Sequence, residues 1–395
     1  MDVNVRAREQ MHPRPRRLFR HILYWRPLQR NDTTVSATTF TVEELIIPTS
    51  RDAPEFADFS EMTDVRNEIE ADIVGSSALS VTAEELLPGY LQQDYERRKL
   101  FVARVDRKIA GRGVLEWSTE EDTNISWITG EVLREHRNRG IGGALFDRLE
   151  AIARESGRTI LQVDTMHSSA EGGERVHPPT GFGDVPAGDP GVRFLRKRGY
   201  TLEQIARASF LDLPVDPARL DQFRQEAQIA AGDDYAVVTW VGPTPPEWRT
   251  DRAYIKNRMS VDEPAAGLEV DEETWDEARV IKYDADGIAS GREMLTAAIL
   301  HVPSGHLVGV NELSVAKDRT RPVGQEDTIV ISEHRGHRLG MLLKVANLQE
   351  LARFSQESPI VFTFNAEENR HMLDVNEAVG FRAVGYDGAW KKTIS

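Results

Sequence analysis

A loop rich in glycine and arginine occurs twice in this chain, each time between an apolar strand-like segment and a long helix-like segment. The two copies span residues 132–153 and 330–352. Arg137 of the first copy aligns with Arg335 of the second at an offset of 198 residues. Similarity at so long an offset indicates two copies of one domain, because solenoid repeats recur every 20–50 residues.

Other matches extend the repeat beyond the loop. Glu116 aligns with Glu312 at an offset of 196, and Gly199 aligns with Gly380 at an offset of 181. The fall from 198 to 181 places 17 extra residues in the first half, after its helix. The stretch 166–191, which is rich in glycine and proline, lies there. A loop of this length is either a functional flap or a tolerated insertion, and the sequence favours neither.

The loop has the chemistry of an anion site. A strand that turns into a helix presents unpaired N–H groups and the positive end of the helix dipole, which together bind a phosphate or pyrophosphate. Gly140, Gly142 and Gly143 are expected to allow close backbone approach and dihedrals that a Cβ forbids. Arg137 and Arg139 add charge and donors. Neither the GxGxxG nor the GxxxxGK(S/T) spacing is present, so the two common nucleotide-binding motifs are not supported.

The first copy resembles the signature of the GNAT superfamily of acyl-CoA-dependent N-acyltransferases, V-x-x-x-x-Q/R-x-x-G-x-G/A. Val132, Arg137, Gly140 and Gly142 occupy its fixed positions. The second copy departs once, with Arg338 where the first glycine is expected. The two-domain arrangement is similar to that of the tandem acetyltransferases of actinobacteria, mycothiol synthase among them.

This resemblance implies a mixed α/β protein with two tandem GNAT-like domains, each a twisted, mostly antiparallel sheet flanked by helices. It implies acetyl-CoA as the acyl donor. The residues that it predicts to bind the cofactor are Val132, Arg137, Arg139, Gly140, Ile141, Gly142, Gly143, Val330, Arg335, Gly336, His337, Arg338, Leu339, Gly340 and Asn369. His334 and His337 lie inside the anion loop, where they are expected to face phosphate or solvent rather than a metal ion.

The resemblance also locates the pantetheine end of the cofactor. In the family an Asn precedes, by seven residues, a Tyr that protonates the leaving thiolate shortly before a Gly-Phe pair. Asn369 stands at the Asn position, but Asn376 stands at the Tyr position, and an amide is no proton donor of that kind. The first half has Gly188 and Leu195 at these two places. The halves therefore keep different parts of the motif, and the pantetheine end favours the second half as the catalytic one.

Three glutamates are candidates for the base. An amine has a pKa near 10 and must lose a proton before it attacks a thioester, and a carboxylate within reach can accept that proton. Glu116 and Glu312 lie at corresponding places on the third predicted strands, and Glu131 lies on the fourth strand of the first half. Each of them is equally compatible with a solvated outward face of a strand. Backbone N–H groups near Val132 or Val330 are expected to hold the oxyanion.

Composition narrows the class of partner. The net charge of −15 argues against nucleic acid and is compatible with a cationic amine acceptor. The absence of cysteine excludes disulfides, thiolate metal sites and a cysteine nucleophile, and no metal site is predicted. No apolar run approaches the roughly 20 residues that span a bilayer. With no recognisable signal peptide, a cytoplasmic location is the expectation.

The domain layout follows from the repeat. Residues 1–37 form an arginine-rich extension, 38–213 the first GNAT domain, 214–233 a linker helix and 234–395 the second domain. The extension is either a basic arm for an anionic or membrane surface or a flexible tail.

The sequence thus predicts an N-acetyltransferase that transfers an acetyl group from acetyl-CoA to a primary amine of a small molecule or peptide. A non-catalytic acyl-CoA sensor or scaffold is the first alternative, because the tyrosine is missing. The second is an aminoacyl-tRNA-dependent peptidyl transferase of related tandem fold, which the two loops and the acidic charge disfavour. The acceptor and the choice between monomer and homodimer stay open.

Overall fold

The computed structural model describes residues 39–120, 123–167, 172–262 and 264–394. The predicted extension at residues 1–37 lies outside this part of the chain. Residues 39–395 form one compact unit. No helix in the described ranges is long and apolar enough to cross a bilayer.

The first half runs from β1 to β8. Its elements are β1 (Phe40–Glu44), α1 (Phe56–Val74), α2 (Ala83–Leu91), β2 (Glu96–Val105), β3 (Lys108–Ser118), β4 (Ile125–Val132), α3 (Ile141–Glu155), β5 (Ile160–His167), β6 (Arg175–Val176), β7 (Val185–Pro186), α4 (Pro190–Lys197) and β8 (Thr201–Asp212). The predicted loop at 166–191 thus contains the short pair β6–β7. Asp189 caps α4 and Pro190 begins it, a combination that favours a helix start.

The second half repeats this order. Its elements are α5 (Pro217–Ala231), β9 (Tyr235–Val241), α6 (Arg249–Asp262), α7 (Glu277–Ala289), β10 (Arg292–His301), β11 (His306–Ala316), β12 (Val323–Val330), α8 (Leu339–Phe354), β13 (Ile360–Ala366), α9 (Arg370–Val379) and β14 (Arg382–Thr393). The linker segment predicted at 214–233 contains α5, which begins with Asp216 as cap and Pro217 at its first position.

One sheet of twelve strands joins the two halves. Its order is β1-β2-β3-β4-β5-β14-β8-β13-β12-β11-β10-β9. Only the pairs β4–β5 and β12–β13 are parallel; every other pair is antiparallel. The mixed α/β class is therefore confirmed, but the two predicted domains do not have separate sheets.

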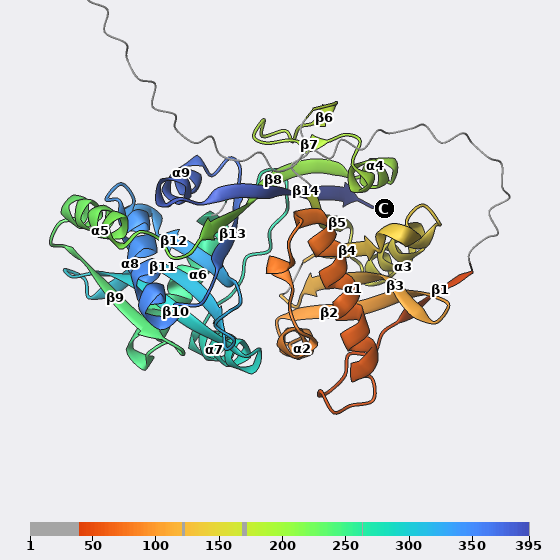
Figure 1. The fold of residues 1–395 in the computed structure, drawn as a ribbon, viewed down its shortest axis with the longest axis horizontal. Helices are drawn as coiled ribbons and strands as arrows, with labels where there is room; N and C mark the ends of the chain where they lie inside the picture. The colour runs from red at the N-terminus through yellow and green to blue at the C-terminus, as the bar shows by residue number, and fades with distance from the viewer. Residues whose placement is uncertain (1–38, 121–122, 168–171, 263, 395) are drawn as a thin grey trace, which may run out of the picture. The chain divides into compact units, whose positions relative to one another are not determined.

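The join is an exchange of strands (Figure 1). The last strand of the chain, β14, lies between β5 and β8 of the first half, and β8 pairs with β13 of the second half. Each half thus places its final strand beside the fifth strand of the other. The exchange leaves no unpaired strand edge at the centre of the molecule, where an exposed edge would invite aggregation.

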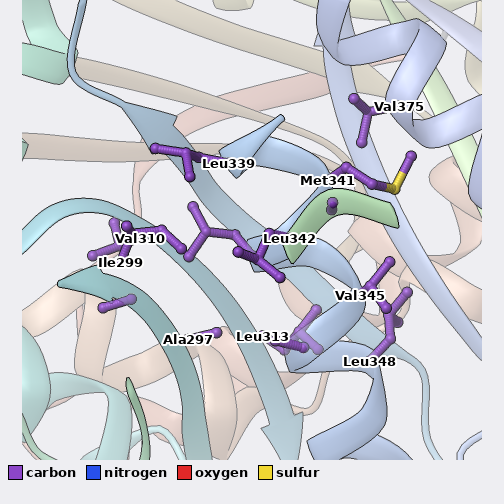
Figure 2. Close-up of a cluster of buried hydrophobic side chains, with 14 of the residues drawn as sticks. Ala297, Ile299, Val310, Leu313, Leu339, Met341, Leu342, Val345, Leu348 and Val375 are labelled. Carbon is purple, nitrogen blue, oxygen red and sulfur yellow. The ribbon is translucent and has the colours of Figure 1, made fainter. Parts of the chain in front are cut away.

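Apolar side chains cover the sheet on both faces. In the second half, α8 packs its buried residues against β10 and β11, with Leu342 and Val345 beside Val310 and Leu313 (Figure 2). In the first half, α3 packs on one face and α1 and α2 on the other. Because the core fixes α3 and α8, the loops that precede these two helices are fixed as well.

Candidate cofactor and acceptor sites

The two glycine–arginine loops have the same backbone geometry. Arg137 Nε donates a hydrogen bond to the carbonyl oxygen of Val132, and Arg335 Nε donates one to that of Val330; both distances are 2.9 Å. The motif arginine therefore closes the loop back onto its own strand. This bond explains why arginine stands five residues after the valine in both halves.

The two loops place left-handed residues at the same two positions. In the first loop these are Asn138 (φ 60°) and Gly140 (φ 88°). In the second they are Gly336 (φ 93°) and Arg338 (φ 55°). Each loop has glycine at one of the two positions, and the position differs. The departure of Arg338 from the family motif is thus accommodated in the left-handed region, at a cost of about 1 kcal/mol.

The expectation for Gly142 and Gly143 was partly wrong. Both lie in the first turn of α3, and neither has a positive φ, so only Gly140 needs glycine for its dihedrals. A Cβ at Gly143, or at Gly340 of the second loop, would meet no atom within 4 Å. These glycines leave open space in front of the helix and do not relieve backbone strain.

Both helices begin without a side-chain cap. The first residues of α3 and α8, Ile141 and Leu339, are buried, and no side chain bonds the first N–H groups of either helix. Unsatisfied N–H groups and the positive end of the helix dipole favour an anion at this point.

A pocket of roughly 500 Å³ opens beside the second loop. Its lining residues are Pro264, Thr328, Ile329, Val330, Arg335, Gly336, Arg338, Leu339, Gly340, Asn369, His371, Met372 and Val375. The structure thus brings six of the seven predicted loop residues together with Asn369. His337 is not among the lining residues; its ring lies 5.2 Å from that of Tyr235.

Asn369, which lines this pocket, also stabilises the start of α9. Its side chain caps α9 by accepting a hydrogen bond from the backbone N–H of Met372, at 3.4 Å. At the predicted tyrosine position, Asn376 is buried and donates to Asn365 Oδ1 at 2.7 Å. The second half therefore has an amide pair where the family motif has its proton donor.

The corresponding space in the first half is narrower. A Cβ at Gly142 would lie 3.7 Å from Phe194 of α4. Val375, which lines the second pocket, corresponds to Phe194 at the offset of 181 residues. The larger ring fills space that is open in the second half.

In both halves the central parallel strands part before the loop. β4 pairs with β5 through Ile128, which faces Val163, and then runs on to Val132. β12 pairs with β13 through Gly324, which faces Phe362, and then runs on to Val330. The parting exposes backbone groups of the fourth strand to a ligand that enters between the strands.

The three predicted bases are held in ion pairs. Glu116 pairs with Arg98, and Glu131 pairs with Arg112 at 2.5 Å between Oε2 and Nε. Glu312 is fully buried, where it pairs with Arg252 and lies 3.5 Å from Lys256 Nζ. The outward, solvated alternative does not apply to Glu312. Its enclosure by two cations does not suit a group that must take a proton from an amine.

Glu312 belongs to a buried network on the side of the sheet covered by α6 and α7. Arg252 also pairs with Asp284, and Lys256 pairs with Asp327. The Lys256 ammonium lies 4.4 Å from the ring centre of Tyr283. Burial opposes the charge of Lys256, but Asp327 and Glu312 outweigh it and raise the pKa of the ammonium.

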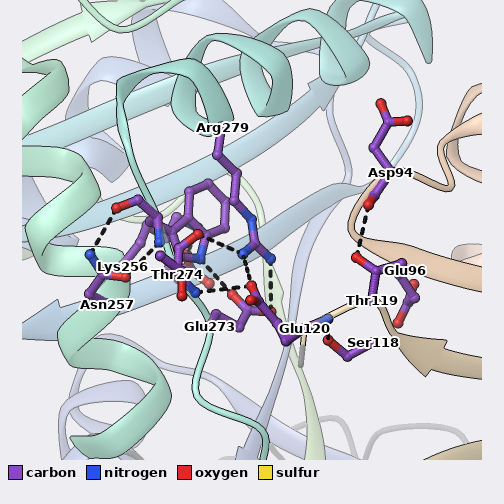
Figure 3. Close-up of polar contacts among 12 residues, drawn as sticks. Asp94, Glu96, Ser118, Thr119, Glu120, Lys256, Asn257, Glu273, Thr274 and Arg279 are labelled. Carbon is purple, nitrogen blue, oxygen red and sulfur yellow. Dashed lines mark hydrogen bonds and ion pairs between the residues drawn. The ribbon is translucent and has the colours of Figure 1, made fainter. Parts of the chain in front are cut away.

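The chain between α6 and α7 reaches the first half. Gln162 of β5 donates to the carbonyl oxygen of Glu269 and accepts from its N–H, at 3.0 and 2.7 Å. Arg279 of α7 bonds Glu120 of the first half at 3.2 Å (Figure 3). The segment that flanks the second pocket at Pro264 therefore also contacts the sheet of the first half.

Sequence reasoning missed a set of carboxylates with raised pKa values. Asp164 is exposed by accessible surface area. The protein packed around it nevertheless disfavours the charged form and, with the charge of Glu116 nearby, raises the pKa of Asp164 to about 7. Burial and the neighbouring Asp164 raise the pKa of Asp387. Burial likewise raises the pKa of Glu70 to about 7. The only signal in the sequence was Asp164, a charged residue in the mostly apolar strand 160–167.

No cluster of metal-ligating side chains occurs within the described ranges.

Comparisons with known proteins agree with this geometry. Residues 69–177 match the model of the acetyltransferase (GNAT) family. A tandem GNAT protein from the clavulanic acid biosynthesis pathway superposes with a TM-score of 0.68 at 23% identity, over 90% of this chain and 98% of that one. A GCN5-related N-acetyltransferase from Sphaerobacter thermophilus has a TM-score of 0.56 at 13% identity, over 90% and 95% of the two chains.

A glucosamine N-acetyltransferase region of a fungal multi-domain β-N-acetylglucosaminidase has a TM-score of 0.57 at 15% identity, over 91% of this chain and 39% of that one. No curated protein matches. Residues 69–177 thus match the GNAT acetyltransferase family, and about 90% of the chain shares its fold with the tandem GNAT protein.

Proposed function

We propose that the protein transfers an acetyl group from acetyl-CoA to a primary amine of a small molecule or peptide. The observation that carries this proposal is the pocket at the N-terminus of α8. It combines uncapped helix N–H groups, the parted fourth strand and Asn369 in one cavity of roughly 500 Å³.

The lining of this pocket fits a polyanionic cofactor. Arg335, Arg338 and His371 are its titratable members, and no carboxylate is among the described lining residues. The N–H groups at the start of α8 would hold the pyrophosphate, and the exposed edge of β12 near Val330 would face the pantetheine amides. Acetyl-CoA, when bound, supplies the thioester.

The rest of the reaction needs few protein groups. A backbone N–H on the fourth strand near Val330 or Val132 stabilises the oxyanion that forms when the amine attacks. Positioning of the two substrates supplies much of the remaining rate enhancement. The net charge of −15 supports a cationic acceptor.

A specific observation favours a second function for the second half alone. Asn376 replaces the proton donor, and Lys256 and Arg252 neutralise the carboxylate of Glu312. A pocket with these neighbours can bind acetyl-CoA without turning it over. The second half would then act as an acyl-CoA sensor for a catalytic first half.

Calorimetric titration of acetyl-CoA into the full chain tests the proposal. Gly340→Asp places a carboxylate at the anion site of the second half, and we expect affinity there to fall at least 100-fold because like charges repel. Gly142→Asp does the same in the first half. Gly340→Ala is the matched control, since its methyl group adds no charge and meets open space.

The stoichiometry distinguishes the alternatives. Two sites, each lost in one aspartate variant, would support cofactor binding by both halves, and one site would identify the binding half. Absence of heat and of any thermal shift with acetyl-CoA would refute the proposed function.

A further inference from the structure

Two aspartates lie next to each other where the central strands of the first half part. Asp164 follows Val163, the last residue of β5 that pairs with β4. On the other side of β5, Ala389 of β14 pairs with Asp164, and Asp387 pairs with Met166. Asp164 and Asp387 are therefore diagonal neighbours on one face of an antiparallel pair, and the charge of Asp164 acts on Asp387.

The register shows which face this is. Glu116 of β3 pairs with Trp127 of β4, and Trp127 pairs with Gln162 of β5. Residues that pair directly across neighbouring strands share a face of the sheet, so Gln162 lies on the same side as Glu116. Asp164, two residues further along β5, lies on that side as well. Val114 of this face packs with α1 and α2. The two aspartates thus lie on the side of the sheet covered by α1 and α2, not on the side of α3.

Burial is the main cause of the raised pKa of both carboxylates, and neighbouring carboxylates add to it. Glu116 acts on Asp164, and Asp164 and Glu70 act on Asp387. The charged groups on this face, with their partners, are Glu70 with Arg66 on α1, Glu116 with Arg98, Glu131 with Arg112, and Lys391 with the carbonyl of Gly267 and with Glu269. Asp387 Oδ1 is buried and has no hydrogen-bond partner within the described structure. A buried polar atom without a partner is rare, so this atom marks the carboxylate of Asp387 as a candidate for a functional role.

We propose that the ionised carboxylates of Asp164 and Asp387 together accept the proton of the acceptor amine in the first half and hold it between them. This inference rests on the acetyl transfer proposed above and assigns its chemical step to the first half. It replaces Glu116, Glu131 and Glu312 as bases, and it departs from the sequence-based preference for the second half.

The acetyl transfer then involves two proton transfers and the exchange of one bond. The ammonium form of the acceptor gives one proton to the carboxylate pair, and the neutral nitrogen forms a bond to the thioester carbonyl carbon. The carbon–sulfur bond then breaks, and the CoA thiolate takes a second proton from the same nitrogen. The products are the amide and CoA thiol, and the proton on the aspartate pair leaves to solvent.

The second half does not have this pair. Gly324 pairs with Phe362 where Ser126 pairs with Leu161, so the position that corresponds to Asp164 is Asn365. Its amide bonds Asn376. The position of Asp387 corresponds to Ile205 of β8, whose carbonyl accepts from the N–H of Glu367.

The two aspartates of the proposed base come from different halves of the chain. Asp164 comes from the first half, and Asp387 comes from the last strand of the chain, which reaches the site through the strand exchange. The reaction centre of the first half therefore requires residues from both halves of the chain.

Two acceptor probes of different basicity test this proposal on the full chain. Ethanolamine is protonated at pH 7 and needs a base, whereas hydroxylamine is already neutral at that pH. We expect Asp164→Asn to lower kcat/KM with acetyl-CoA and ethanolamine about 100-fold or more. Hydroxylamine turnover and acetyl-CoA affinity should change less than about threefold, since neither uses the base. Asp147→Asn on α3, across the sheet, is the matched control and should change neither.

The pH dependence of the rate distinguishes the roles of Asp164 and Asp387. Asp387→Asn removes a like charge beside Asp164, so the pKa of Asp164 falls and the acid limb of the rate profile moves to lower pH by about one unit. A merely structural role for Asp387 would lower the rate at every pH without moving that limb.

The outcomes distinguish this inference from the proposed function. Wild-type turnover of ethanolamine with an unchanged rate and profile in both variants would overturn the aspartate pair and leave the transferase proposal standing. Wild-type turnover of hydroxylamine alone would also overturn the pair. Failure of the wild type to bind acetyl-CoA or to turn over either amine would overturn both.

Discussion

Glu116 and Glu312 occupy corresponding positions on the third strands of the two halves, but their surroundings differ. The side chain of Glu116 is 24% exposed and pairs with Arg98, whereas that of Glu312 is fully buried between Arg252 and Lys256. The second half has therefore neutralised its carboxylate with cations of its own chain. The first half keeps two further aspartates, Asp164 and Asp387, whose strongest charged neighbours are acids.

At the two glycine–arginine loops, it is the second half that has the more open site. Their backbones match at Arg137 and Arg335, yet the space in front of the helix is open beside Val375 and narrowed by Phe194. Backbone geometry has thus been retained in both copies, while the side chains around it have changed. The comparison shows that a repeat can conserve a scaffold without conserving the surroundings of each site.

The largest expected effect is at Glu312. Glu312→Gln should lower the free energy of unfolding by about 2 to 3 kcal/mol, because Arg252 and Lys256 lose their contacts with its buried carboxylate and keep only Asp284 and Asp327. Glu116→Gln should cost at most about 1 kcal/mol, since its pair is partly hydrated. Urea denaturation measures both. Equal losses would remove the proposed difference between the two carboxylates.

Lys344 gives a second contrast, with Phe146 at the corresponding place in the first half. Burial lowers the pKa of Lys344 to about 7, below its value of about 10.4 in the unfolded chain. The unfolded state therefore binds more protons between pH 7 and 10, and stability rises with pH across that window.

Lys344→Met should remove this rise. It should also stabilise the protein at pH 7 by roughly 2 kcal/mol, after loss of the hydrogen bond from Nζ to Gln325. Phe146→Met is the control and should leave the pH dependence intact. A stability profile that keeps its slope in the lysine variant would show that Lys344 is not its source.

Val375→Phe makes the second pocket like the first. The added ring should fill cofactor space and weaken acetyl-CoA binding to the second half about tenfold. Phe194→Val is the reciprocal change and should strengthen binding to the first half. Calorimetry on each variant measures the effect, and unchanged affinity in both would show that these positions do not control access to the cofactor.

The smallest effect is expected at the left-handed loop positions. Arg338→Gly should raise stability by about 0.5 kcal/mol, because relief of the positive φ slightly exceeds the entropy that glycine adds to the unfolded chain. Asn138→Gly should change stability less, since asparagine tolerates this region. Thermal unfolding resolves the order; a larger gain for Asn138→Gly would reverse the comparison of the two loops.

The sequence predicted what depends on local spacing. The strand–loop–helix units at 132–153 and 330–352 are local features, because each is fixed within a few residues. The resemblance to GNAT proteins, based on these units, is confirmed over residues 69–177 and in the fold.

The sequence did not predict what depends on distant pairing. The pairing of β14 with β5 joins residues more than 200 positions apart, so nothing near Asp164 or Asp387 indicates that they meet. The same holds for Glu312, since Arg252 and Lys256 reach it from α6. The predicted bases were chosen by their strand positions alone, and their ion-pair partners could not be read from spacing.

The exchanged strand also affects how the chain folds during synthesis. The first half contains every residue of β1 to β5, but the strand that lies beside β5 is made last, ending at Thr393. On the ribosome the first half therefore waits with an open sheet edge until β14 has left the exit tunnel. A product that stops short of β14 lacks the strand between β5 and β8, so closure of the sheet requires translation to continue through β14.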